Sequence, residues 1–441
     1  MIQKTAFIAV GCLAFFLNIL LADDQVTGID TTLASQYFQE AKAASDQDAP
    51  KMWGVALYGP MLFADEDTRT VVANQPDENG ALHKQGDVFV GKLPPEVNIA
   101  NTATDWAGVK WTMIGWPLPD EKNDRVRLMM HELFHRIQDS IKLPANNPAN
   151  NHLDSKNGRI WLRMEWRALE HATFEQGKAR QSAVADALFF RRYRQSLFPQ
   201  ALAEETSLET NEGLAEYTGV RLAAHSEAER LARAYYNLRR AVFKPTFARS
   251  FAYVTGPAYG LLLDSVGDHW RHTIKSGDDL SAILQQALKI KLPALSEAEA
   301  LSRARHYDGG EVIADETERD KHHTELVAKY RAKLVDGPVL ILPVANSFNF
   351  SFDPNDVVAL DDSSTIYPKL RVTDDWGVLE VSDGALMFRS SKGFTKLQVA
   401  APSNAQARPL QGEGWKLELN PAWTLVPGTR NGDFLLEKKK D

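Results

Sequence analysis

Polar and apolar positions repeat with different periods in different parts of this chain. From Asp30 to Ser45 the apolar residues recur at helical spacing, which predicts an amphipathic helix. Short runs rich in β-branched and aromatic residues follow, separated by Pro, Gly and Asn, and they predict a small antiparallel sheet. These runs are Trp53–Leu62, Thr70–Ala73, Val88–Val90 and Val109–Gly115.

Helical spacing dominates the middle of the chain. Asp124 is placed to cap a helix that ends near Ile141, ahead of a segment rich in Pro and Asn. Nearly all of the range 159–288 is predicted to be helical, and a last helix is predicted over Asp315–Leu334. The expected breaks in the long helical range are Pro199, Pro245 and Gly256–Pro257.

The pattern changes again after Gly337–Pro338, where short alternating or apolar runs are separated by turn residues. Examples of these runs are Val339–Val344, Val378–Val381, Leu386–Phe388 and Trp415–Leu419. A chain of 441 residues is longer than one hydrophobic core usually grows, so two packed units are expected. The prediction is an α+β fold, with an antiparallel sheet and a mostly helical lobe in residues 23–337 and a β-rich domain in residues 338–441.

The first 22 residues differ from the rest of the chain. Lys4 precedes an apolar run from Ala6 to Leu21, and Ala22 is followed by two aspartates. This pattern is typical of a secretory signal peptide cleaved near Ala22, which predicts an extracytoplasmic protein, either periplasmic or secreted. The alternative is an uncleaved membrane anchor, because the run nearly reaches the length needed to span a bilayer. Only in that case is a membrane partner expected.

Composition and charge exclude some other partners. The net charge is −8, and lysine and arginine form no block of the kind that binds nucleic acid. No Gly-rich phosphate loop precedes a predicted helix, so a nucleotide is not expected either. Cys12 is the only cysteine, and cleavage near Ala22 would leave a chain without thiols.

The first segment with candidate metal ligands and a candidate base is His131-Glu132-Leu133-Phe134-His135. Residues four apart in a helix project from one face, so His131 and His135 can bind one Zn²⁺ together. Glu132 lies beside that face, where it can accept a proton from a zinc-activated water. The segment lies inside a predicted amphipathic helix that follows a strand.

A second segment, Asn211–Tyr217, completes the predicted site. Glu212 is predicted to be the third zinc ligand, and Glu216, one turn later, is predicted to orient a ligand imidazole. Catalytic zinc needs three protein ligands and one open position, which two histidines and one glutamate provide. Gly213 and Ala215 are small enough to let this helix approach its neighbours closely. Three acids in the nearer helix compete for the ligand role: Glu165, Glu170 and Glu175.

Together these two segments resemble the gluzincin group of zinc peptidases, which includes thermolysin and the aminopeptidase N type. The resemblance implies that Glu132 is the general base, that Glu212 is the third ligand and that Glu216 supports a ligand histidine. A third segment, Tyr253–Tyr259, resembles the tyrosine-plus-glycine helix start of the aminopeptidase N type. The resemblance implies that Tyr253, or Tyr259 in its place, donates to the oxyanion.

The sequence differs from these families at several points, and the differences narrow the type of peptidase that is expected. Seventy-six residues separate His135 from Glu212, considerably more than is usual there, so an extra helical hairpin over about Arg159–Phe198 is expected. The segment that holds a free amino end in the aminopeptidases has no counterpart, because Trp111–Trp116 stands in its place. An endopeptidase is therefore favoured over an aminopeptidase. Gln138 and Ile141 exclude the metzincin pattern, which needs glycine and histidine at these positions.

The sequence thus predicts a zinc-dependent peptidase with one zinc per chain and a peptide or protein substrate. One alternative is another extracytoplasmic zinc hydrolase that acts on a different amide, with the same residues in the same roles. A second alternative is a non-catalytic binding protein that keeps the zinc for structure. Glu132 argues against the second, because a structural site needs no base and normally has a fourth protein ligand.

Overall fold

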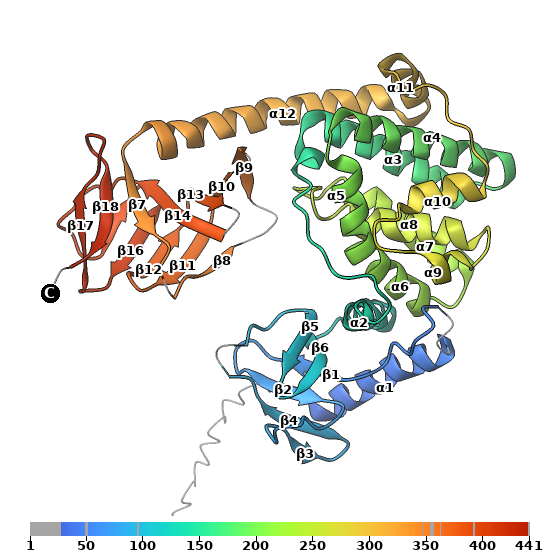
Figure 1. Ribbon diagram of the computed structural model, residues 1–441, viewed down its shortest axis with the longest axis horizontal. Coiled ribbons are helices and arrows are strands. Elements are labelled where there is room, and N and C mark those ends of the chain that lie inside the picture. The colour runs from blue at the N-terminus through green and yellow to red at the C-terminus, as the bar shows by residue number, and fades with distance from the viewer. Residues whose placement is uncertain are drawn as a thin grey trace, which may run out of the picture.

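The structure of the protein is a computed structural model that describes residues 28–48, 52–94, 97–345, 347–352, 357–361, 363–390 and 393–439 (Figure 1). The predicted signal peptide, residues 1–22, lies outside these residues. The described chain is α+β, with a long helical middle and a β-rich C-terminal region. None of its described helices combines the length and the apolar character that a membrane span requires.

The N-terminal part consists of one helix and a six-stranded sheet. The elements are α1 (Thr31–Asp48), β1 (Met61–Ala64), β2 (Thr70–Ala73), β3 (His83–Gln85), β4 (Val88–Lys92), β5 (Thr102–Trp106) and β6 (Val109–Gly115). The strand order is β3-β4-β2-β1-β6-β5. The prediction of an antiparallel sheet is wrong for one pair, because β6 runs parallel to β1. The β5–β6 hairpin adds its second strand beside β1, and such non-local pairing has no local signal.

The predicted strand Trp53–Leu62 is also wrong over most of its length, since β1 begins only at Met61. Gly54, Gly59 and Pro60 interrupt that run and disfavour a strand. Trp53 belongs to the helical core instead, where its Nε1 donates to Thr218 Oγ1 at 3.0 Å. The sequence did not predict β3 or β5, whose residues are largely polar.

The helical middle of the chain meets this sheet through its first helix, which lies between the sheet and the other helices (Figure 1). Its elements are α2 (Lys122–Ile137), η1 (Asn151–Asp154), α3 (Lys156–Phe174), α4 (Gly177–Leu197), α5 (Ala201–Leu208), η2 (Glu209–Gly213), α6 (Leu214–Ala223), α7 (Glu227–Ala241), α8 (Ala252–Asp264), α9 (Trp270–Thr273), α10 (Leu280–Ala287), α11 (Glu297–Ala304), η3 (Arg305–Tyr307), α12 (Gly309–Arg331) and η4 (Ala332–Asp336). Alternate residues of β1 divide between two cores. Met61 and Phe63 pack with the helices, while Leu62 and Ala64 face a smaller core on the other side.

Several helix boundaries differ from the predictions. The last helix, predicted over Asp315–Leu334, begins at Gly309 and is α-helical to Arg331. Glu121, not Asp124, caps α2, because its carboxylate accepts the backbone N–H of Asn123; Asp124 pairs with Arg233 at 2.6 Å. The helix ends at Ile137, one turn earlier than predicted. Pro257 lies inside α8 and does not end a helix. Proline removes one backbone hydrogen bond there. Almost all residues of α8 are buried in the core, and this burial maintains the helix.

The C-terminal region consists of two sheets that share one apolar core. Their strands are β7 (Val339–Pro343), β8 (Asn349–Phe352), β9 (Val358–Asp361), β10 (Ser364–Tyr367), β11 (Leu370–Asp374), β12 (Gly377–Val381), β13 (Ala385–Ser390), β14 (Gly393–Ala400), β15 (Leu410–Gly412), β16 (Trp415–Leu419), β17 (Trp423–Pro427) and β18 (Phe434–Lys438). The strand orders are β17-β18-β7-β14-β13-β10-β9 and β15-β16-β12-β11-β8. Leu397 of the first sheet and Leu379 of the second lie in the common core.

The helix α12 connects this region to the helical middle of the chain (Figure 1). At its first half, Glu316 pairs with Arg159 and Arg163 of α3, each at 2.8 Å. At its end, Tyr330, together with Leu334 of the following turn η4, packs with apolar residues of β10 and β13. One helix is therefore anchored in both regions.

Candidate metal centre

The two histidines of the first motif lie on α2, and the packing of this helix fixes where they point. Its apolar positions, including Met130 and Phe134, are buried in the core, and its neighbour is α6. A Cβ atom on Gly219 of α6 would come within 2.5 Å of the carbonyl oxygen of Arg127, so only glycine permits this approach. The close approach brings the second motif, at the start of α6, towards His131 and His135.

Three potential ligand atoms converge at this place. The Nε2 atoms of His131 and His135 are 3.1 Å apart, and Glu212 Oε2 lies 3.5 Å from the first and 3.6 Å from the second. Ligands bound at about 2.0–2.1 Å to a tetrahedral zinc ion lie roughly 3.3 Å from one another. The three atoms therefore fit one face of a zinc coordination sphere with almost no rearrangement.

Both imidazole rings are held from their far side. His131 Nδ1 lies 3.0 Å from Glu216 Oε2, and both oxygens of Glu216 accept from Arg127 Nη1. His135 Nδ1 lies 2.6 Å from the amide oxygen of Gln138. A carboxylate and an amide oxygen can only accept here, so each Nδ1 carries the proton and each Nε2 is free to bind a metal.

Glu212 comes from η2, a single π-helical turn between α5 and α6. Its Oε1 accepts from Arg249 Nη2 at 2.6 Å, and its Oε2, the oxygen that faces both histidines, accepts from the Tyr253 hydroxyl at 2.5 Å. His131, His135 and then the Tyr253 hydroxyl hold the pKa of Glu212 well below its ordinary value despite burial. Glu212 is therefore an anion at neutral pH.

The field of the carboxylates also acts on His131. Burial alone would lower the pKa of this imidazole, but its bonds to Glu212 and Glu216 outweigh burial and raise the pKa to about 9. The pocket thus stabilises positive charge between the ligand atoms. The same carboxylate charges would stabilise a divalent cation bound there.

Glu132 lies next to this triangle and is only 5% exposed. Its Oε2 is buried without a hydrogen-bond partner among the described residues. Burial raises the pKa of the Glu132 carboxyl, although the two histidines oppose the shift. An unpaired buried carboxylate oxygen is costly, and Glu132 Oε2 is left able to accept a hydrogen bond from a molecule in the cleft.

Tyr253, on α8, reaches the same place. Its ring stacks on His131 with 5.6 Å between the ring centroids, and its hydroxyl contacts the potential metal ligand directly. Burial and the Glu212 charge raise the pKa of the phenol well above 10, so the hydroxyl stays protonated and can donate. Tyr259, the alternative oxyanion donor predicted from the sequence, does not line the cleft, and its hydroxyl donates to Glu165.

The three competing acids do not reach the triangle. Glu165 is fully buried and pairs with Arg191 and Arg194, and neither Glu170 nor Glu175 lines the cleft around the histidines. Among the described residues, only His131, His135 and Glu212 form a group that could hold a metal.

Sequence reasoning missed the residues that hold the ligands: Arg127, Gln138, Asn147 and Arg249. Arg127 and Gln138 lie at helical spacing from the histidines, which was a usable signal. The other two lie in loops, and Asn147 accepts from Arg249 Nη1 and from Asn211 Nδ2, both at 3.0 Å. No pattern along the chain links them to Glu212.

A cleft of about 670 Å³ opens over the triangle. Its lining includes the edge strand β5 with the preceding Asn101, and also η2, Arg249 and Tyr253. Most of the lining side chains are polar or charged. The cleft is thus large enough for several residues of an extended chain.

Comparison of the chain with protein-family models, with curated proteins and with solved structures gives no significant match in any of the three. The chemistry of this site is accordingly argued from its own geometry.

Proposed function

We propose that this chain is a zinc-dependent peptidase of the gluzincin type, with a zincin-like catalytic unit. His131, His135 and Glu212 bind one Zn²⁺, and Glu132 is the general base. One observation carries the proposal: three potential ligand atoms converge at tetrahedral spacing beside Glu132 Oε2, a buried carboxylate oxygen without a hydrogen-bond partner among the described residues. A structural zinc site would supply a fourth protein ligand, whereas this cluster leaves that position to the cleft.

Each residue has a distinct task in this mechanism. A bound zinc ion supplies a Lewis acid and lowers the pKa of a water towards ~7. Glu132 accepts the proton of the attacking water and returns it to the leaving amine. Tyr253 donates its hydroxyl hydrogen to the oxyanion of the substrate, a contribution of about 3 kcal/mol. Glu216 and Gln138 keep the imidazoles in the tautomer that the reaction needs.

The edge strand β5 supports a peptide as the substrate over other amides. Among the described strands it pairs only with β6, so the N–H and C=O groups of its other edge have no strand beside them. Thr102, Ala103 and Asp105 of this strand line the cleft. An extended peptide can pair with such an edge and lie across the metal.

The test separates metal binding from catalysis. We expect the purified parent to hold one zinc per chain and to cleave fluorescein-labelled casein or internally quenched peptides. Glu132→Gln should keep the zinc and lose turnover by roughly 10²–10⁴-fold, because it removes the base and no ligand. Glu170→Gln, which alters an acid outside the cleft, is the matched control.

Each outcome has one meaning. Zinc with no cleavage of any peptide, but hydrolysis of other amides, favours the alternative zinc hydrolase. Zinc with equal turnover in parent and Glu132→Gln means that the site is structural. Absence of zinc after purification without chelators, or iron in its place, overturns the proposal.

We also propose that the protein acts outside the cytoplasm, on the strength of the N-terminal pattern alone. N-terminal sequencing of the protein recovered from the periplasm or medium should then begin near Asp23. A mature chain that starts at Met1 and fractionates with membranes would support the anchor instead.

A further inference from the structure

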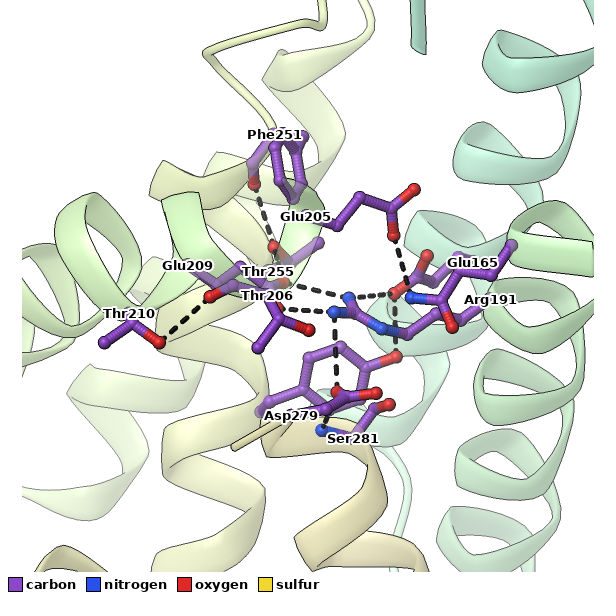
Figure 2. A network of polar contacts seen from close by, with 12 residues as sticks. Glu165, Arg191, Glu205, Thr206, Glu209, Thr210, Phe251, Thr255, Asp279 and Ser281 are labelled. Atoms are coloured by element: carbon purple, nitrogen blue, oxygen red, sulfur yellow. Dashed lines mark hydrogen bonds and ion pairs between the residues drawn. The ribbon is translucent and has the colours of Figure 1, made fainter. Parts of the chain in front are cut away.

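A second cluster of buried charge lies behind the metal centre, and we call it the arginine network. Its members come from four helical elements (α3, α4, α5 and η2) and from the residue before α10: Glu165, Arg191, Arg194, Glu205, Glu209 and Asp279. Figure 2 shows Arg191 at its centre, with Glu165, Glu209 and Asp279 around the guanidinium group. Arg191, Arg194, Glu165 and Glu205 are completely buried.

A network of buried charges contributes little net free energy to the stability of a fold. Moving charged groups out of water costs several kcal/mol per ion, and well-packed apolar residues often replace buried ion pairs without loss of stability. Buried polar networks that are well satisfied instead define one arrangement of the elements they join. The question is which arrangement this network defines.

The network reaches the metal centre through Glu209. This residue opens the π-helical turn η2, and Glu212 lies three residues later in the same turn. Arg191 binds both oxygens of Glu209, with Nη1–Oε1 at 2.9 Å and Nη2–Oε2 at 2.5 Å. A bidentate pair of this kind restricts both position and rotation.

The same carboxylate also holds the helix that carries Tyr253. The hydroxyl of Thr255, two residues after Tyr253 on α8, donates to Glu209 Oε1 at 2.5 Å. Close by, a Cβ atom on Gly256 would lie 2.3 Å from the Cα atom of Gly213, so η2 and α8 touch backbone to backbone. Glu209 thus joins the two elements that bring Glu212 and Tyr253 to the histidines.

The π-turn itself needs such support. Its closing bond runs from the Leu214 N–H to the Glu209 carbonyl, five residues apart, and π-turns are rare insertions in α-helices that are frequent at functional sites. Reversion to a regular α-helix would rotate Glu212 relative to Glu216. One of the two carboxylates would then no longer meet His131.

We propose that Arg191, acting through Glu209 and Thr255, is a positioning residue that fixes the π-turn and holds Glu212 at the metal. The inference rests on the proposed metal site. It assigns a role to the hairpin of α3 and α4, which lengthens the sequence between His135 and Glu212: α4 supplies Arg191, and α3 supplies Glu165 as its further partner.

The test compares two arginines of equal burial. Arg191→Lys loses the bidentate contact with Glu209, whereas Arg194→Lys loses contacts with Glu165 and Glu205 and leaves η2 untouched. Zinc dissociation constants are measured by competition with a chromophoric chelator, and stability is measured by urea unfolding of the zinc-free chains. We expect zinc affinity to fall about 10- to 100-fold in Arg191→Lys and to change less than about 3-fold in Arg194→Lys.

A milder pair of variants covers the case in which Arg191→Lys does not fold. Thr255→Val removes the hydroxyl that reaches Glu209, and Thr173→Val removes one that bonds only to the Glu170 carbonyl of its own helix. We expect weaker zinc binding, and a changed visible spectrum of the cobalt-loaded protein, in Thr255→Val alone.

Equal zinc affinity in Arg191→Lys and Arg194→Lys, or an unchanged cobalt spectrum in Thr255→Val, overturns the inference and leaves the peptidase proposal intact. A parent chain that binds no metal overturns both.

Discussion

Two clusters of buried carboxylates lie in the helical part of this protein, and they differ in what the carboxylates face. In the arginine network, Glu165, Glu205 and Glu209 all contact guanidinium groups, and the cluster does not line the cleft over the two histidines. In the metal centre, Glu212 faces two imidazoles and a phenol at the base of that cleft. Paired charge that is closed to solvent indicates a structural role, and converging ligand atoms beside an open space indicate binding.

The sharpest way to test this contrast is to remove one acid from each cluster. Glu212→Ala should weaken zinc binding by on the order of 10³-fold, about a third of a ~12 kcal/mol binding free energy. Glu165→Gln should keep the zinc and instead lose about 3–5 kcal/mol of unfolding free energy, because Arg191 and Arg194 lose a charged partner. Elemental analysis and urea unfolding measure the two effects. Loss of zinc in Glu165→Gln at unchanged stability would reverse the two assignments.

A tyrosine donates to a glutamate in each cluster, which gives a matched pair of variants. Tyr253→Phe should lower kcat by about 10²-fold with zinc retained, because it removes the oxyanion donor. Tyr259→Phe should leave kcat unchanged and cost about 1–3 kcal/mol of stability, because Glu165 loses a buried hydrogen bond. If Tyr253→Phe changed stability alone, its hydroxyl would be a structural partner of Glu212 and nothing more.

A smaller loss of zinc affinity is expected for Glu216, which contacts the ligand His131 and does not bind the metal itself. Glu216→Gln leaves all three ligands in place but weakens the support of His131 Nδ1 and the pairing with Arg127. Zinc affinity should fall about 10- to 100-fold. Chelator competition on Glu216→Gln and on the surface variant Glu318→Gln checks this, and the second protein should match the parent.

A pH dependence of zinc binding is also expected, and the arginine network should lack it. The pKa of His131 is about 9 in the metal-free protein, so below that pH zinc must displace a proton from the imidazole. The apparent zinc affinity should therefore rise about tenfold per pH unit between pH 6.5 and 8.5, and this contribution should level off above pH 9. A constant affinity over that range, measured by competition at three pH values, would show that His131 is already neutral.

Much of the site could be predicted from the sequence because its parts are local. Helical spacing alone places His131 and His135 on one face. Glu212 and Glu216 are also four residues apart in the sequence, but the π-turn η2 sets their relative rotation. The structure brings these residues together and keeps Glu165 away from them. The roles of base, ligand and oxyanion donor stay predictions until metal and activity are measured.

Elements in which apolar residues recur at regular spacing were predicted well, and elements without such spacing were not. The amphipathic helix at Asp30–Ser45 corresponds to α1, and the four C-terminal runs correspond to β7, β12, β13 and β16. The polar strands β3 and β5 were missed, although β5 borders the cleft. Its place depends on pairing with β6, which a composition of Thr, Ala and Asp does not reveal.

The sequence by itself determined the pair of histidines, the two acids one turn apart and the change to β-structure after Pro338, because each is a pattern within a few turns of chain. Only the tertiary structure decided that Glu212 and not Glu165 meets the histidines, that Arg127 and Arg249 hold the carboxylates, and that β1 and β6 run parallel. These facts depend on contacts between residues far apart in the chain. Packing of whole helices and sheets selects such contacts, and no local periodicity encodes them.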